Sequence, residues 1–496
     1  MTAPSTDRDV RTTRVFAARI WRPDRTSLAP PATVTAAVVT GLVAGVTVRA
    51  GQPGVAYPLI GMAVVATVLS SGRTRSTRGP LLAAALVVAL LAVAAVRGAG
   101  WLIALCVIAG WTVGSVALLG VRTWTGVALA PLAVAVTPGR VAGWLRRGRR
   151  RRRRVGGVPA GRILGVALVS GGLLVVFGWL FAGADPEFAR LLGGAVPTVP
   201  TDELTAGIVI GLGVVAVSLS AAYLWRRPIR FDALAPAAGR PIACWEWAVP
   251  LIALDLLFAG FVAVQARVMF AGDGHVLTTP GLTYADHARQ GFWQLCAVTA
   301  LTLLVVAVAI RKVDLAARRD RAFARVLLGV LCLLALVVVA SALHRMALYE
   351  NAFGYTRLRL AVWAVELWFG AVFVIALVAG IRMRGQLLPR VVLGSAAVAL
   401  LAFAAVNPDG HIADRNIDRY QRTGAIDVTY LRGLSVDAVP ALDRLPEPLR
   451  SCALLGTSTS PDPWYRFNAA RDRAREILGA RPVDRDVVCA GATAVR

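Results

Sequence analysis

The 496-residue sequence lacks the short motifs that mark the common enzyme classes. It contains no Walker loop, no GxGxxG that follows a strand and opens a helix, no HExxH and no GxSxG. Its six cysteines form no CxxC pair, and cysteine and histidine show no spacing typical of zinc. We therefore expect no cofactor, no metal centre and no catalytic residue, and we favour a protein that is not an enzyme over an enzyme.

Charged residues are also scarce, at 17% of the chain, whereas 57% is apolar. A soluble protein carries about a quarter charged residues and about half apolar ones. Long apolar runs recur at short intervals, so most of the chain belongs to one lipid-embedded bundle. These features predict an all-α polytopic membrane protein.

Eleven stretches are apolar enough to cross a bilayer core, which takes roughly 17–25 residues. They are Ala32–Val48, Val55–Ser71, Pro80–Val96, Ala99–Val121, Ile163–Gly183, Thr205–Trp225, Trp245–Met269, Gly291–Ile310, Phe323–His344, Leu358–Ile381 and Leu387–Val406. A further apolar stretch, Gly126–Val136, is too short to cross. We expect it to form an interfacial or a re-entrant helix.

The basic residues orient these spans. Lys312 is the only lysine, so arginine carries almost all of the formal net charge of +26. With the amino terminus inside, every inner segment is basic, and the outer Ala184–Leu204 connection holds four acids against Arg190 alone. This is the positive-inside pattern. We predict a bacterial plasma membrane protein with a cytoplasmic amino terminus and an extracytoplasmic carboxyl terminus.

The composition divides the chain into five parts. They are a cytoplasmic polar leader (1–31), a four-helix membrane bundle (32–121), a cytoplasmic Arg-rich loop (122–162), a seven-helix membrane bundle (163–406) and a small, mostly helical tail (407–496). The leader has no apolar core, so we do not expect a cleavable signal peptide.

A dense arginine run lies in the cytoplasmic loop. It consists of Arg146, Arg147, Arg149, Arg150, Arg151, Arg152, Arg153 and Arg154. Such a run can bind RNA or anionic lipid, or it can simply hold a loop in the cytoplasm. No aromatic stacking residues interleave it, which argues against nucleic acid. We expect a topology anchor that contacts anionic lipids.

Two acids, Asp255 and Glu366, fall near the middle of their predicted spans. Charge at the bilayer centre costs about 2.5–3.5 kcal/mol on insertion scales, so such residues face the bundle interior and find partners. If they face each other, the pair could share a proton in a proton-coupled carrier. The alternative is that each is neutral or is hydrogen-bonded to a Ser, Thr or Trp of another helix.

The four histidines, His275, His287, His344 and His411, all fall on the predicted outer side near acidic residues. Imidazole and carboxylate together can bind a divalent metal. No pair has HxxxH or HxxE spacing, so we expect solvated or capping histidines.

The tail contains two predicted helical segments. Asp462 and Pro463 form an amino-terminal cap for a helix over Trp464–Leu478, and Asp418–Leu434 is the second segment. Cys452 and Cys489 lie in this tail, where the predicted compartment permits a disulfide between them.

Five phrases in this order resemble a known family. They are FGWLFAGADPEFARLL (177–192), YADHARQGFWQLCAV (284–298), LYENAFGYTRLRL (348–360), NPDGHIADRNIDRY (407–420) and IDVTYLRGLSVDAVPAL (426–442). The set is similar to the bacterial membrane family called domain of unknown function 4173 and to its sister family 4153. The resemblance covers roughly Ile163–Leu478 and leaves out the first four spans. It implies a polytopic bundle with an outer polar tail, and no established reaction.

The polar residues of these phrases map to the outer side. They are Tyr284, Arg289, Tyr349, Glu350, Arg357, Arg359, Asn407, Asp409 and Asn416. They either tie the tail onto the bundle or form a ligand site, and we favour the first interpretation. We therefore expect a non-catalytic envelope sensor or scaffold. The alternative is a proton-coupled secondary transporter that uses Asp255 and Glu366.

Overall fold

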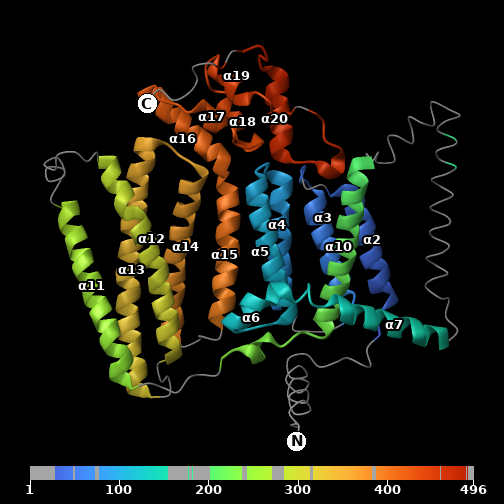
Figure 1. Ribbon diagram of the computed structural model, residues 1–496, viewed down its shortest axis with the longest axis horizontal. Helices are drawn as coiled ribbons and strands as arrows, with labels where there is room; N and C mark the ends of the chain where they lie inside the picture. Colours follow the sequence, from blue (N-terminus) through green and yellow to red (C-terminus); the bar gives the residue numbers. More distant parts are fainter. Residues whose placement is uncertain are drawn as a thin grey trace, which may run out of the picture.

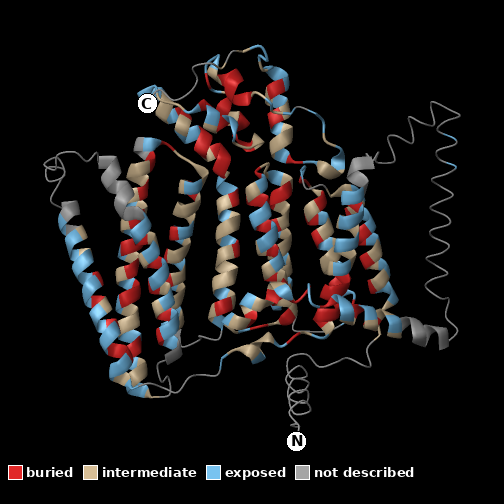
Figure 2. Cartoon of the chain, in the orientation of Figure 1, coloured by how far each residue is buried: buried red, intermediate tan, exposed pale blue. Residues whose placement is uncertain are grey.

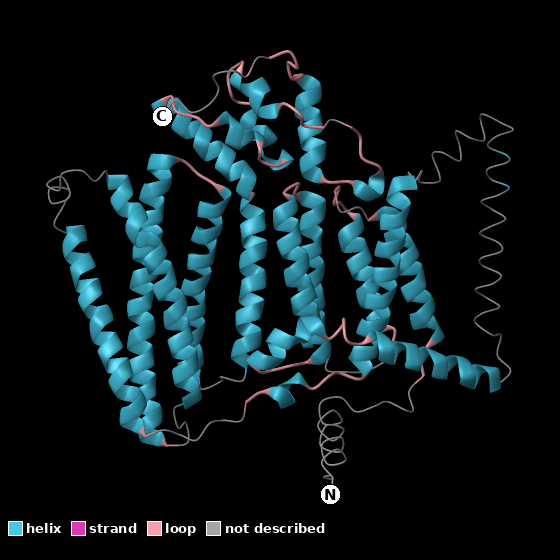
Figure 3. Cartoon of the chain, in the orientation of Figure 1, coloured by secondary structure: helices cyan, strands magenta, loops and turns pink. Residues whose placement is uncertain are grey.

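The structure is a computed structural model that describes residues 28–48, 51–72, 78–154, 177, 181, 201–236, 243–270, 284–312, 317–382, 387–458, 460–487 and 489. Within these ranges all regular structure is helical (Figure 3). Long helices stand side by side, and a small group of short helices covers one end of them (Figure 1).

Eight helices in the described part are long and apolar enough to cross a membrane. They are α4 (Arg78–Val96), α5 (Gly100–Leu119), α10 (Thr201–Arg226), α11 (Cys244–Phe270), α12 (Tyr284–Lys312), α13 (Arg318–Phe353), α14 (Arg357–Arg382) and α15 (Leu388–Val406). Two shorter apolar helices, α2 (Pro31–Thr47) and α3 (Ala56–Leu69), stand beside them. The predicted all-helical multi-pass membrane protein is confirmed, while of the predicted span Ile163–Gly183 the structure describes only residues 177 and 181.

The outer surface of these helices is apolar, as a lipid environment requires. Leu82 is 72% exposed, and Leu256 and Leu257 of α11 are each 68% exposed. Buried residues instead lie between helices and in the group of short helices (Figure 2). The bundle therefore presents apolar side chains both inward and outward.

The helices pack in an order that differs from their order in the chain. The antiparallel pair α2 and α10 is in close contact, and α15 packs against α4 and α5. The helices α11, α12, α13 and α14 form a second group around an apolar core that includes Leu331 and Phe373. The boundaries drawn from the sequence at 121 and 163 stay predictions, but helices on either side of them are packed together.

The short apolar stretch Gly126–Val136 lies at the end of the bundle opposite to the helices of the tail (Figure 1). It forms α6 (Trp124–Leu129) and η1 (Ala130–Leu132), which pack against α5, α15 and η2 (Phe231–Leu234). Asp232 of η2 fixes its start, since the carboxylate accepts hydrogen bonds from the amides of Arg122 and Thr123 at 3.0 Å. The chain then enters α7 (Pro138–Arg154), which runs across the direction of the long helices (Figure 1).

The tail folds into a compact unit, the C-terminal module (residues 407–489). Its helices are α16 (Pro408–Thr423), α17 (Val428–Arg432), η5 (Val436–Ala438), α18 (Val439–Leu442), α19 (Leu449–Leu454), η6 (Trp464–Arg466) and α20 (Ala469–Ala480). Their apolar faces enclose one core that includes Ile417, Leu442 and Leu454. A disulfide joins Cys452 to Cys489 and closes the last part of the module.

Two helix boundaries in the tail differ from the sequence prediction. The predicted helix Trp464–Leu478 begins only at Ala469, because Asn468 caps it by accepting a hydrogen bond from the Arg471 amide at 3.0 Å. Asp462, the predicted cap, instead accepts a hydrogen bond from the Arg471 side chain at 2.7 Å. The other predicted segment, Asp418–Leu434, is interrupted at Gly424, whose φ of 73° ends α16.

Candidate functional site

The C-terminal module rests on three connections of the bundle, and we call this contact region the junction. The connections are α2–α3, α4–α5 and α13–α14. Each of them contributes backbone groups as well as side chains. The junction therefore depends on the shape of the bundle end and not only on a few exposed charges.

An ion pair between Arg357 and Asp409 links α14 to α16. The guanidinium donates two hydrogen bonds to the carboxylate, at 2.8 and 2.6 Å, and Asp409 also accepts from the Ser435 amide at 2.8 Å. The Asp409 side chain is fully buried, whereas that of Arg357 is 36% exposed. Burial alone would raise the pKa of Asp409, but these hydrogen bonds and the positive charge of Arg357 bring it below the ordinary value.

Asn416 and Tyr355 form a second link between the module and the α13–α14 connection. The side chain of Asn416 accepts a hydrogen bond from the Tyr355 amide at 3.1 Å and donates one to the Tyr355 carbonyl at 2.9 Å. The Tyr430 hydroxyl accepts from the Arg357 amide at 2.7 Å. A side-chain amide that pairs with both backbone groups of one residue fixes the register of the contact.

Asn407 is the residue at which the bundle becomes the module. It is both the carboxyl-terminal cap of α15 and the amino-terminal cap of α16, with a left-handed φ of 59°. Its side chain accepts from the Gly410 amide at 3.4 Å and donates to the Asp437 carbonyl at 3.3 Å. Asparagine tolerates this conformation better than most residues because its short polar side chain bonds locally.

The remaining predicted outer-face residues lie in the end turns of α12, α13 and α14. Arg359 stacks over the Tyr349 ring at 4.4 Å and donates to the Tyr349 hydroxyl at 3.2 Å. Glu350 is 4% exposed, and one of its carboxylate oxygens has no hydrogen-bond partner in the described part of the chain. Tyr284 and Arg289 lie in the first turns of α12, and their side chains are outside the described structure.

The junction also uses residues that the sequence analysis missed. Arg97 donates to the carbonyls of Ala404 and Ala405 at the end of α15, both at 2.8 Å. Asn468 donates to the carbonyls of Ala94 and Arg97 at 2.9 and 2.8 Å. These partners are more than 300 residues apart in the chain. The sequence shows that Arg97 and Asn468 are polar, but it does not indicate which groups they bind.

Arg471 and Arg466 extend these contacts to the α2–α3 connection. Arg471 donates to the Pro53 carbonyl at 2.9 Å, and Arg466 donates to the Gln52 side chain at 2.8 Å. The Val55 amide donates to the Phe467 carbonyl at 3.0 Å. The third connection is therefore held mainly through backbone groups.

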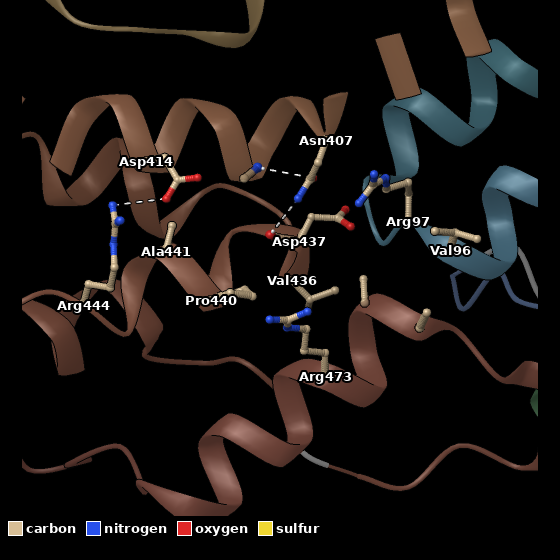
Figure 4. A pocket seen from close by; sticks show the side chains of 13 residues that line it. Val96, Arg97, Asn407, Asp414, Val436, Asp437, Pro440, Ala441, Arg444 and Arg473 are labelled. Atoms are coloured by element: carbon tan, nitrogen blue, oxygen red, sulfur yellow. Dashed lines mark hydrogen bonds and ion pairs between the residues drawn. The ribbon is translucent and has the colours of Figure 1, made fainter. Parts of the chain in front are cut away.

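A pocket of about 410 Å³ opens in the junction between the α4–α5 turn, α16, α18 and α20 (Figure 4). Its charged lining residues are Arg97, Asp414, Asp437, Arg444 and Arg473. Figure 4 shows Arg473 reaching from α20 on one side, while the Asp437 carboxylate points toward Arg97 on another. The pocket thus brings acidic and basic groups from separate elements together.

The two predicted intramembrane carboxyl groups have different neighbours. Asp255 of α11 lies near Cys332 of α13, whereas Glu366 of α14 lies beside Cys296 and Thr299 of α12. They are 8% and 1% exposed, and their carboxylate oxygens meet no donor in hydrogen-bond geometry in the described part. The described neighbours of the two groups thus lie on different helices, α13 for Asp255 and α12 for Glu366, and the facing pair stays a prediction.

Two of the four predicted outer histidines, His344 and His411, have described side chains, and these lie on different helices. His411 of α16 is T-shaped against the Tyr355 ring at 6.1 Å, and burial lowers its pKa. His344 lies in α13, the His287 side chain is not described, and His275 lies outside the described residues. Among the described residues, no group of three or more metal-binding side chains is close enough to hold an ion.

The comparisons with known proteins give one result. The sequence model of a family described as Domain of unknown function (DUF4153) matches residues 84–445, which is most of the chain. The chain belongs to this family. Searches of the curated proteins and of the solved structures found no match to the chain.

The family region agrees with the sister family named from the sequence, but its limits differ. It begins inside α4, so α4 and α5 are part of the family region and not outside it, as the sequence resemblance had implied. It ends at residue 445, before η6 and α20. It therefore contains the Arg357–Asp409 pair and the joint at Asn407 but not the Asn468 contacts.

Proposed function

We propose that this protein is a non-catalytic sensor or scaffold of the bacterial envelope, and that its C-terminal module works while docked on the bundle. The observation that supports this most is the pattern of contacts at the junction. Side chains of the module bond to backbone groups of three bundle connections, as Asn416, Asn468 and Arg471 illustrate. Such contacts couple the module to the bundle, because a shift of the helices displaces the backbone groups of the connections that the module binds.

We further propose eleven crossings, a cytoplasmic amino terminus and an extracytoplasmic module. The described helices support this arrangement, since α7 lies at the end of the bundle away from the module and α10 begins at the module end. The predicted span Ile163–Gly183 supplies the crossing between them. The disulfide between Cys452 and Cys489 favours an oxidising compartment for the module.

We also propose that the arginine run of α7 contacts anionic lipid headgroups. Trp144 anchors the first half of α7 in the bundle, where it is fully buried and T-shaped against Tyr223 at 5.6 Å. The rest of α7 then carries the run Arg146–Arg154 away from the bundle at the proposed cytoplasmic end (Figure 1). Each arginine near an anionic leaflet contributes about 1 kcal/mol of attraction.

The test of the main proposal is complementation of a strain from which the gene has been deleted. The full chain, a truncation lacking 407–496 and the undocking variant Asn468→Ala are compared for growth under envelope stress. We expect the truncation to insert in the membrane but to fail, and Asn468→Ala to be weakened. The exposed Arg432→Ala is the control. Full rescue by the inserted truncation rules out a role for the module.

A proton-coupled secondary transporter is the second candidate, supported by two carboxyl groups buried inside apolar helices, Asp255 and Glu366. Either group could carry a proton, alone or as a pair. Vesicles with purified protein should then take up solute when a pH gradient is applied, and Asp255→Asn or Glu366→Gln should reduce the rate. Unchanged uptake in both variants removes this candidate.

A further inference from the structure

The junction pocket contains one negatively charged group that is short of a partner. Asp437 is 4% exposed, and its Oδ2 accepts hydrogen bonds from the Gly98 amide and the Ser435 hydroxyl, both at 2.8 Å. Its Oδ1 has no hydrogen-bond partner in the part of the chain that the structure describes. Burial raises the pKa of Asp437 despite those bonds and the nearby positive charge of Arg97. A buried carboxylate oxygen without a donor is costly, so a bound donor would stabilise it.

Among the described arginines that line the pocket, Arg473 is the one that is not already engaged. Arg444 is shared between Asp414 and Asp418, at 3.1 and 3.6 Å. Arg97 donates two of its hydrogen bonds to the end of α15. Arg473 is exposed, and within the described residues its guanidinium makes no hydrogen bond or ion pair. It is therefore the group available to an anion.

Arg473 and Asp437 favour a ligand that carries both a negative and a positive group. An anion would pair with Arg473, while a cation or an N–H donor would satisfy Oδ1 of Asp437. A dianionic phosphate does not fit, because it would place excess negative charge near Asp437 and Asp414 with only one uncommitted guanidinium. The volume of about 410 Å³ is at the small end of the roughly 300–1,000 Å³ range of ligand pockets.

We propose that the junction pocket binds a small zwitterion, an amino acid or a short peptide, whose carboxylate pairs with Arg473 and whose ammonium group donates to Oδ1 of Asp437. The ligand would bridge α20 and η5 next to the α4–α5 turn. It would thereby add a contact that is made only when module and bundle are docked. The inference rests on the proposed function, since it names the ligand class that a docked sensor would detect.

The test is isothermal titration calorimetry on the full-length protein in lipid nanodiscs. The probes are L-alanine, dialanine and trialanine, because the number of residues sets the distance between ammonium and carboxylate. The controls are the N-acetyl and methyl ester derivatives of the best probe and inorganic phosphate. We expect at least one zwitterion to bind and each blocked derivative to bind at least about tenfold more weakly, a difference of about 1.4 kcal/mol.

Variants then locate the site. Arg473→Ala should weaken binding of the best probe at least about tenfold, whereas Arg432→Ala, an exposed arginine of the module outside the pocket, should leave it unchanged. Asp437→Asn should weaken the zwitterion more than its N-acetyl derivative. The proposal is wrong if no zwitterion binds, if phosphate binds as tightly, or if Arg473→Ala binds normally.

The outcomes separate this inference from the proposed function. If the truncation fails to complement and no zwitterion binds, only the proposal of a zwitterionic ligand is wrong. Zwitterion binding at Arg473 together with full rescue by the truncation would overturn only the functional role of the module.

Discussion

Asp409 and Asp437 are buried acids of the same module, yet their surroundings act in opposite directions. Asp409 receives two hydrogen bonds from Arg357 and one from the Ser435 amide, which favours its charged form. Asp437 accepts hydrogen bonds from uncharged donors, among them the Gly98 amide and the Ser435 hydroxyl, and burial outweighs these bonds and the nearby charge of Arg97, so its pKa is raised. Asp409 therefore stabilises the contact between module and bundle, whereas Asp437 keeps one carboxylate oxygen without a donor in the described part of the chain.

Arg357→Ala should loosen the module from the bundle. The substitution leaves the fully buried Asp409 without its counter-ion, which we expect to cost about 2–3 kcal/mol, below the value for fully buried pairs because Arg357 is partly exposed. Limited proteolysis of the tail in nanodiscs measures this as faster cleavage. Arg432→Ala serves as control, and equal cleavage rates in the two variants would disprove the prediction.

The Asp409 pair should also make docking sensitive to acid. Because the folded-state pKa of Asp409 lies below its ordinary value of 3.8, its contribution to stability is complete at neutral pH, starts to decline near pH 3.8 and is lost as the pH falls through the lower folded-state pKa. Asp409→Asn should be less stable than the wild type at pH 7, and the gap in thermal unfolding should shrink below about pH 4. A gap that stays constant between pH 7 and pH 3.5 contradicts this.

Several arginines have a second role beside orienting the spans. Arg226 donates to the Ser71 carbonyl at 2.6 Å and Arg390 to the Val121 carbonyl at 2.6 Å, at the bundle end away from the module. Both acceptors lie just after the last turn of a helix, where carbonyls lack intrahelical donors. The arginine excess at this end thus also stabilises helix ends, which the charge count alone does not reveal.

At the scale of elements, the closest helix contact is between α2 and α10. A Cβ atom added at Gly45 would lie 2.7 Å from the Gly207 carbonyl, and one added at Gly211 would lie 2.8 Å from the Gly41 carbonyl. Both helices thus present glycines four residues apart to each other, a pattern that allows backbones to approach in lipid. These glycines allow α2 and α10, which are far apart in the chain, to pack closely together.

Gly211→Ala should therefore separate α2 from α10, with an expected loss of about 1–3 kcal/mol. Gly213→Ala is the matched control on the same helix, because a Cβ there meets nothing within 4 Å. We expect Gly213→Ala to be neutral or stabilising, since alanine is a better helix former by about 1 kcal/mol. Thermal unfolding in detergent compares the two, and equal midpoints would disprove the close contact.

At the scale of the molecule, the disulfide provides a test of sidedness. If the module is extracytoplasmic, Cys452 and Cys489 should resist maleimide in intact cells until a reductant is added. The double variant Cys452→Ser with Cys489→Ser should destabilise the module by about 4 kcal/mol in the loop-entropy view. Immediate labelling of both cysteines without reductant, or a reporter after Arg496 active only in the cytosol, would reverse the proposed orientation.

Hydropathy predicted the long helices because a helix in lipid is apolar on all sides, both where it packs on other helices and where it contacts lipid. The helix α11, for example, differs from its predicted span by only one residue at each end. The start of α20 was missed because Asp462 and Asn468 are equally good caps by type. The spatial order of helices could not be read from hydropathy. For this reason the neighbours of Asp255 and Glu366 and the partners of Arg97 stayed unknown.

Because Asn407 caps both helices, no linker residue separates the last long helix, α15, from the first helix of the tail, α16. With 16 residues at about 1.5 Å each, α16 is a lever arm of about 24 Å rooted in the bilayer. A 5° tilt of α15 would swing its far end by roughly 2 Å, about the change that breaks a hydrogen bond. Membrane thickness and tension, which set helix tilt, are thus mechanically coupled to the geometry outside the lipid.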